Sequence, residues 1–222
     1  MQPLASDILL ATRSEGKLRE LRPLFAGHRV RILDLRDAGI AESAAEDALE
    51  AHDTFEENAL AKARYFHALS GRPTVADDSG LVVDTLGGRP GVHSKRWSGR
   101  DDLRGLALDE ENNRLLLERL RGATDTRAHY ICVAAFVDGR RELTRRGEVH
   151  GRIIDRRTGS HGFGYDPYFF ADELGRTFGE ATREQKERVS HRARAFRRLL
   201  AALESGDATA DLRARDDAPV QS

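Results

Sequence analysis

Between Thr54 and Gly71 the sequence has the pattern of one amphipathic helix, and no other segment constrains the fold as much. Apolar side chains recur here at helical spacing: Phe55, Ala59, Ala63, Phe66 and Leu69. Thr54 followed by Glu57 three positions later is a capping box, and Gly71 is a typical stop signal. We therefore predict a helix that packs one face against a core.

Short apolar segments alternate with further helical patterns along the rest of the chain. The expected strands are Asp7–Ala11, residues 30–33, Thr74–Ala76, Leu81–Val83 and the two arms, Tyr130–Val137 and Leu143–Ile154, of a β-hairpin that turns at Asp138 and Gly139. The expected helices are Glu15–Phe25, Leu103–Leu120 and a last helix that begins near Ser190 and stops at Gly206. This alternation predicts a mixed α/β protein.

Composition limits the class of protein further. With 222 residues, 39% of them hydrophobic, the chain can bury a sizeable core as one domain, expected over residues 1–206, with two lobes. The polar residues 207–222 are expected to be disordered. A single cysteine inside an apolar run, Cys132, and the lack of a segment that could span a membrane favour a cytoplasmic protein. The net charge of −1 favours no nucleic-acid partner.

Two polar segments near the N-terminus have the character of a phosphate site. Residues 11–17, Ala-Thr-Arg-Ser-Glu-Gly-Lys, join a strand to a helix, where free backbone N–H groups attract phosphate and Lys17 adds a charge. The segment is not a P-loop, and an ordinary capped helix start is the alternative. Asn58 and Lys62 are four residues apart on one helix face, close to Glu50, and can reach one ligand unless that face is simply solvated.

The sequence Asp77-Asp78-Ser79-Gly80 follows a short apolar strand, and ligands bind at strand ends in open α/β sheets. Two adjacent carboxylates repel each other unless a cation joins them. Mg²⁺ is the natural cation, and one carboxylate can instead accept a proton from water. The alternative is that the four residues simply form a turn.

Two segments near the C-terminus could bind a base. Residues 162–167, Gly-Phe-Gly-Tyr-Asp-Pro, place two aromatic rings and a carboxylate in a glycine-rich loop, which could also be a rigid structural turn. Lys186 and the cations of Ser190-His191-Arg192 lie at or before the start of the last helix, where they oppose the helix dipole and an anionic ligand would explain them. A merely basic surface is the competing interpretation.

Taken together and in order, these motifs resemble the inosine triphosphate pyrophosphatase family over about residues 7–204. Pro90–Arg96 and Gly147–Gly151 are similar to two more of its stretches. The resemblance implies an elongated, two-lobed α/β fold with a long mixed sheet and the active site in the cleft between the lobes, usually as a homodimer. It also implies hydrolysis of ITP, dITP and XTP to the nucleoside monophosphate and pyrophosphate.

The resemblance assigns roles to positions of this chain. Thr12, Arg13, Ser14 and Lys17, with Lys62, would bind phosphates; Glu50 with Asp77 or Asp78 would hold Mg²⁺; Asp78 would accept a proton from water; and Ser79 would contact substrate. Phe163, in the loop with Gly164 and Tyr165, would stack on the base, while Asp166, Lys186, His191 and Arg192 would bind the nucleotide. Arg192 would donate to the 6-keto oxygen of the purine.

The chain departs from the family at three positions, and other functions stay open. Asparagine is usual where Ser14 stands, tyrosine where His93 stands and a small residue where Arg13 stands. One alternative is a pyrophosphatase for modified pyrimidine or thymidine triphosphates. Another, prompted by Ser14, is a nucleotide sensor without turnover, and a third is a nucleic-acid-binding protein that uses the arginine-rich last helix.

Overall fold

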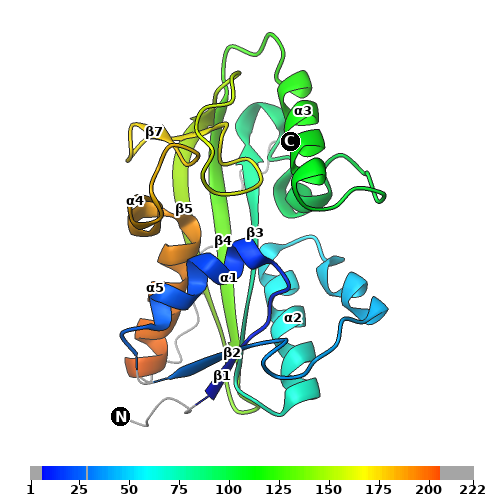
Figure 1. Cartoon of the computed structure of the whole chain (residues 1–222), viewed down its shortest axis with the longest axis vertical. Coiled ribbons are helices and arrows are strands. Elements are labelled where there is room, and N and C mark those ends of the chain that lie inside the picture. Colours follow the sequence, from blue (N-terminus) through cyan, green and yellow to red (C-terminus); the bar gives the residue numbers. More distant parts are fainter. Residues whose placement is uncertain (1–6, 29, 206–222) are drawn as a thin grey trace, which may run out of the picture.

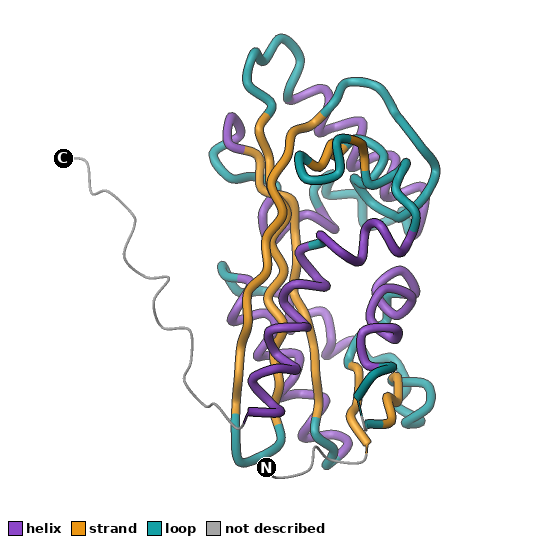
Figure 2. Tube along the Cα trace, turned by 90° about the vertical axis from the view of Figure 1, so that its left-hand side faces the viewer, coloured by secondary structure: helices purple, strands orange, loops and turns teal. Residues whose placement is uncertain are grey.

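A single mixed sheet runs through the computed structural model, which describes residues 7–28 and 30–205 (Figure 1 and Figure 2). Its strand order is β2-β1-β3-β4-β5-β6-β7. The strands are β1 (Asp7–Leu10), β2 (Arg31–Asp34), β3 (Thr74–Val83), β4 (Arg127–Val137), β5 (Glu142–Ile153), β6 (Phe169–Ala171) and β7 (Arg176–Thr177). β1 pairs in parallel with β2 and β3, and the other pairs are antiparallel. The predicted α/β class is confirmed.

Five α-helices and four short 3-10 helices connect the described strands. They are α1 (Glu15–Leu21), η1 (Arg22–Phe25), η2 (Ala44–Glu50), α2 (Phe55–Ser70), η3 (Asp84–Leu86), η4 (Gly91–Arg96), α3 (Gly105–Arg119), α4 (Arg183–Val189) and α5 (His191–Ser205). The predicted helix after Thr54 is confirmed as α2, whose N-cap hydroxyl accepts from Glu57 N at 3.2 Å and whose C-cap Gly71 has a φ of +66°. The predicted stop at Gly206 and the tail 207–222 lie outside the described residues.

The hydrophobic core consists of three clusters arranged along the sheet. α1 and α5 cover one face of the lower half in Figure 1, where the rings of Phe25 and Phe196 meet edge to face, and α2 covers the other face. The third cluster lies at the opposite end, where Leu116 and Leu120, at the C-terminal end of α3, pack with residues of β4, β5 and β6. This division agrees with the expected elongated, two-lobed shape.

β3 corrects one prediction. The sequence suggested two short strands on either side of a turn at Asp77–Gly80, but Thr74–Val83 is one continuous strand. All ten of its residues pair in register with β4, from Thr74 opposite Val137 to Val83 opposite Ala128. The turn-forming preference of these residues is overridden because strand pairing with β4 satisfies their backbone groups. The two carboxylates therefore lie in the middle of a strand and not at its end.

None of the described helices combines the length and the apolarity that crossing a bilayer would require.

We predict that Gly147→Ala destabilises the protein. A Cβ at Gly147, on β5, would lie 2.2 Å from the carbonyl oxygen of His191 and 2.5 Å from Ala195 N, so α5 would have to move away from the sheet. Overpacking of this kind lowers the free energy of unfolding by roughly 1–3 kcal/mol. Chemical denaturation measures it. Gly27→Ala is the control, because a Cβ there meets no atom within 4 Å; equal stability of the two variants would contradict the prediction.

Candidate active site

The predicted phosphate loop lies where β1 separates from β3. β1 pairs with β3 only through Leu9 and Leu10, and Ala11 N still donates to Val75 O at 2.8 Å before the chain turns into α1. Ser14 is the N-cap of α1, and its hydroxyl accepts from Lys17 N at 3.3 Å. The edge of β3 beyond Val75 is thus left open to this loop. Ligands bind at the carboxyl ends of strands in open α/β sheets, and the strand that ends at this site is β1 and not β3.

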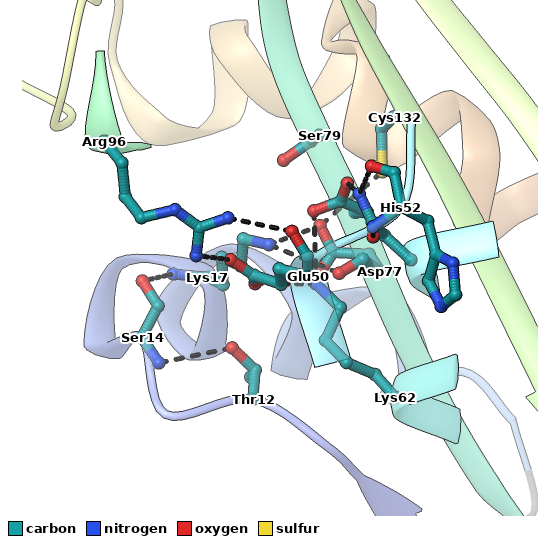
Figure 3. A network of polar contacts seen from close by, with 12 residues as sticks. Thr12, Ser14, Lys17, Glu50, His52, Lys62, Asp77, Ser79, Arg96 and Cys132 are labelled. Carbon is teal, nitrogen blue, oxygen red and sulfur yellow. Dashed lines mark hydrogen bonds and ion pairs between the residues drawn. The ribbon is translucent and has the colours of Figure 1, made fainter. Parts of the chain in front are cut away.

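Asp77 points from β3 toward α1 and α5. Its Oδ2 lies 3.0 Å from Lys17 Nζ (Figure 3) and 3.2 Å from Arg192 Nε. Its Oδ1 is buried and has no hydrogen-bond partner among the described residues. Burial alone would raise the pKa of this carboxyl, but the charges of Lys17 and Arg192 hold it well below its usual range. Asp77 is therefore a fixed anion with one oxygen still available.

Asp78 points to the opposite face, as successive residues of a strand do, and meets α2. Its carboxylate accepts from Lys62 Nζ and from Asn58 Nδ2, both at 3.1 Å. Lys62 Nζ also lies 2.9 Å from Glu50 Oε1, and although burial opposes it, the charges of Lys62 and Lys17 lower the pKa of Glu50 to about 2. Asn58 and Lys62 are buried, so the alternative of a solvated helix face is wrong.

Arg13 points away from the other phosphate-loop cations. Its guanidinium forms a bidentate pair with Glu46, at 2.7 and 3.1 Å, and donates to the carbonyl oxygens of Ile40 and Ala41, each at 2.9 Å. Glu46 belongs to η2, which ends at Glu50. The arginine that departs from the family pattern thus holds the segment that carries Glu50, and these four hydrogen bonds occupy its guanidinium.

The base-side residues lie next to this charged cluster. The ring of Phe163 packs directly on Gly16, where a Cβ would come within 2.6 Å of Phe163 Cδ1. Lys186 Nζ lies 5.1 Å and Arg192 Cζ 5.7 Å from the centroid of the same ring. Phe163 from the predicted base loop, Gly16 from the predicted phosphate loop and the two predicted nucleotide-binding cations are therefore close together.

Glu20 joins these cations and was missed by the sequence analysis. Its Oε1 lies 2.6 Å from Lys186 Nζ, which also contacts Asp166 Oδ2 at 2.6 Å, and its Oε2 pairs with Arg192. Burial opposes ionisation, yet Lys186 and Arg192 lower the pKa of Glu20 to about 2. Glu20 follows Lys17 by three residues on α1, so helical spacing was the signal that could have found it.

Four predicted site residues contact other residues of the protein. Ser79 Oγ accepts from Arg192 at 2.8 Å, and the buried ring of His191 stacks on Tyr130 with 4.6 Å between centroids. Burial, with the neighbouring charge of Arg192, keeps the pKa of His191 well below its usual range, so the ring is neutral. Gly164 is bound through its backbone to α3, and the Tyr165 hydroxyl donates to Ser94 O at 2.7 Å. Their roles toward substrate stay predictions.

The arginine-rich last helix does not present a continuous basic surface. Arg192 is 3% exposed. Arg194 lies 2.6 Å from Glu173, and Arg197 lies 3.5 Å from Glu187. The fourth arginine, Arg198, is exposed and donates to the carbonyl oxygen of Arg146. One of the four charges of α5 is thus buried and two are paired, which leaves Arg198 as the arginine of this helix without a carboxylate partner among the described residues.

The carboxylates of the site have the right chemistry for a hard cation. Among residues 7–28 and 30–205, no group of three or more histidine, cysteine, aspartate or glutamate side chains is placed to hold a metal ion. Mg²⁺, however, commonly takes only one or two protein carboxylates and completes its shell with water and substrate phosphate. The free Oδ1 of Asp77 fits that pattern. The carboxylate of Glu50, 2.9 Å from Lys62 Nζ, is the second candidate ligand.

The described part of the chain contains cavities away from the charged cluster and beside it. One of about 150 Å³ lies beside the phosphate loop and is lined by Thr12, Arg13, Leu18, Asp34, Leu35, Arg36 and Glu42. A larger one of about 730 Å³ lies between the end of α3 and the end of β5, and its lining includes none of the predicted site residues. The chemistry is therefore assigned from the charged cluster and not from cavity size.

Comparisons with known proteins agree with this site. The model of the Ham1 family matches residues 8–202. The dITP/XTP pyrophosphatase of Aromatoleum aromaticum is 45% identical over 203 residues, 90% of this chain and 98% of that protein. The dITP/XTP pyrophosphatase of Bordetella parapertussis is 42% identical over 203 residues, covering 90% and 92% of the two chains.

Solved structures give the same result. A Ham1 protein from Coxiella burnetii superposes with a TM-score of 0.78 at 30% identity, covering 90% of this chain and all of that one. A nucleoside-triphosphatase, or dITP/XTP pyrophosphatase, from Mycobacterium abscessus has a TM-score of 0.65 at 40% identity, covering 89% and 98%. Both the sequence match and the shared fold extend over nearly the whole chain, and the protein belongs to the Ham1 family.

Proposed function

We propose that this protein hydrolyses non-standard purine nucleoside triphosphates, ITP, dITP and XTP, to the nucleoside monophosphate and pyrophosphate. The observation that carries the proposal is the set of buried, alternating charges around β3. Lys17 and Lys62 each contact a β3 carboxylate, and Phe163 lies against Gly16 at the start of α1. The residues proposed to bind phosphate are thus adjacent to an aromatic ring that could stack on a base. The naming of close relatives as dITP/XTP pyrophosphatases supports the choice of substrate.

The phosphate end of the substrate would bind between α1 and α2. Backbone N–H groups of residues 12–17 and the ammonium groups of Lys17 and Lys62 would face the phosphate oxygens. Lys17 contacts Asp77 and Lys62 contacts Asp78. The phosphate oxygens of a bound substrate would then form additional ion pairs with the same two ammonium groups. Preorganised cations of this kind stabilise the charge that develops on departing pyrophosphate.

Asp78 would act as the proton acceptor for the attacking water. Its carboxylate is oriented by Lys62 and Asn58, which fixes its position on the α2 face of β3. We propose that Glu50 and Asp77 would hold Mg²⁺, since Asp77 Oδ1 has no other partner. When bound, Mg²⁺ would offset the negative charge of the phosphate chain.

The base would stack on Phe163 within reach of Lys186 and Arg192. Each guanidinium nitrogen of Arg192 already has a protein acceptor, in Asp77, Glu20 or Ser79. This fixes the guanidinium in one orientation, and its remaining N–H groups would meet a 6-keto oxygen favourably and a 6-amino group unfavourably. A homodimer, which the resemblance implies, is also proposed, and sedimentation analysis would test it. A cytoplasmic location is proposed from the single cysteine, Cys132.

Asp78→Asn is predicted to abolish turnover while the fold is retained. The amide cannot take a proton from water, so kcat for ITP should fall by at least about 100-fold. Steady-state assays at saturating ITP and thermal unfolding of the same preparation measure the two effects. Asp84→Asn is the matched control, because Asp84 is an exposed carboxylate just after the same strand; near-normal activity of Asp78→Asn would refute the assigned role.

The substrate preference gives a second prediction. Pyrophosphate release should be at least about tenfold faster from ITP and XTP than from GTP, ATP or dTTP, because only the correct pattern of keto and amino groups leaves no buried donor unpaired. A chelator should stop release, and added Mg²⁺ should restore it. A preference for dTTP would favour the pyrimidine alternative, and nucleotide binding without release would favour the sensor.

A further inference from the structure

Helix α3 contributes none of the predicted site residues, yet it contacts two loops of the site. Asn112 and Asn113 are adjacent, and each is 3% exposed. They are polar residues on a helix whose Leu108 and Leu116 are also buried. Buried amides need partners, and the partners of these two belong to different segments.

Asn113 and Asp109 hold the backbone of Gly164. Asn113 Nδ2 donates to Gly164 O at 3.0 Å, and Gly164 N donates to Asp109 Oδ2 at 2.8 Å. Both polar backbone groups of Gly164 are therefore bound to one helix, at a residue whose φ is +61°. The neighbouring residue is Phe163, so these two bonds fix the loop that presents its ring.

The side-chain amide of Asn113 is oriented for this contact, and its oxygen is left without a hydrogen bond among the described residues. Its Nδ2 also donates to Asp109 O at 2.8 Å, while its buried Oδ1 has no partner. A buried side chain that served only to satisfy its own polar atoms would not leave one of them unpaired. The orientation is explained by the need for a donor facing Gly164 O.

Asn112 holds the loop on the other side of the site. Its Oδ1 accepts from Ser98 N at 2.8 Å, and its Nδ2 donates to Lys95 O at 3.0 Å. Between those two residues lies Arg96, whose Nη2 donates to Glu50 O at 2.8 Å and whose Nη1 donates to Glu50 Oε2 at 3.3 Å. Asn112 therefore supports the position of Glu50 through Arg96.

We propose that α3 positions the two ends of the bound nucleotide separately: Asn113 with Asp109 fixes the Phe163 loop for the base, and Asn112 fixes the Arg96 loop, and with it Glu50, for the phosphates. The inference rests on the proposed function. Asp109, Asn112 and Asn113 are positioning residues in this scheme, since none of them touches the reacting atoms. If α3 served only to stabilise the fold, substitutions in it would weaken binding at both ends of the nucleotide alike.

The test uses the two reaction products as separate probes of the full chain. Calorimetry gives the Kd of IMP, which carries the base, and the Kd of pyrophosphate in the presence of Mg²⁺, which reports the phosphate end. Asp109→Ala and Asn113→Ala should weaken IMP binding about tenfold, the size of effect expected when base stacking is impaired, and leave pyrophosphate binding unchanged. Asn112→Ala should weaken pyrophosphate binding and leave IMP binding unchanged.

Two further variants keep the result interpretable. Asp109→Asn retains an oxygen that can accept from Gly164 N, so IMP binding should be close to that of the unsubstituted chain. Glu110→Ala removes an exposed carboxylate from the same turn of α3 and should alter neither Kd. If Asn113→Ala does not fold, Asn113→Asp removes the same donor at constant size.

Equal weakening of both products by all three alanine variants, or no change in either, would overturn the assignment. Pyrophosphate release from ITP by the unsubstituted chain is measured separately. Its absence would count against the proposed function, whereas the pattern of Kd values among the variants tests α3 alone.

Discussion

The burial of two adjacent carboxylates in the middle of β3 is the constraint on which the rest of this structure depends. Asp77 and Asp78 are 2% and 6% exposed, and a buried charge without a partner destabilises a fold severely. Because the two side chains point to opposite faces of the sheet, each face must supply its own cation. Lys17 of α1 and Arg192 of α5 do so on one face, and Lys62 of α2 does so on the other. The helices that pack on β3 are therefore the same ones that supply the charged side chains of the candidate site.

Arg192 connects this charge network to the base side. It contacts Asp77, which is part of the phosphate end, and Glu20, which also binds Lys186. α1 carries Lys17 and Glu20 on neighbouring positions of one helix face, so a short helix serves both ends of the site. Such networks are cooperative, since loss of one member leaves another charge buried and unpaired. The same packing that buries these side chains thus fixes their charges in place.

Two of the departures from the family pattern, Ser14 and Arg13, form contacts with neighbouring segments of the protein. Ser14 uses its hydroxyl as the N-cap of α1, and Arg13 binds Glu46 and two carbonyl oxygens next to η2. With both residues in place, the loop still runs from β1 to α1 beside β3. Arg13 also gives η2 a fixed attachment, which matters because η2 ends at Glu50. The support for Glu50 thus comes from two directions, from Arg13 through η2 and from α3 through Arg96.

The sequence by itself predicted most of the local elements and a set of candidate site residues that the structure brings close together. The helix after Thr54 and the hairpin around Asp138 follow from spacing, capping and turn chemistry, which depend on near neighbours alone. Only the tertiary structure decided that Asp77–Gly80 continues a strand, that Asn58 and Lys62 are buried, and that Glu20, Arg96 and the asparagines of α3 contact the candidate site or its loops. Those outcomes depend on contacts between residues far apart in the chain, such as β3 with β4 and Glu20 with Lys186. Local preference cannot encode such contacts, because their free energy arises only when distant segments exclude water together.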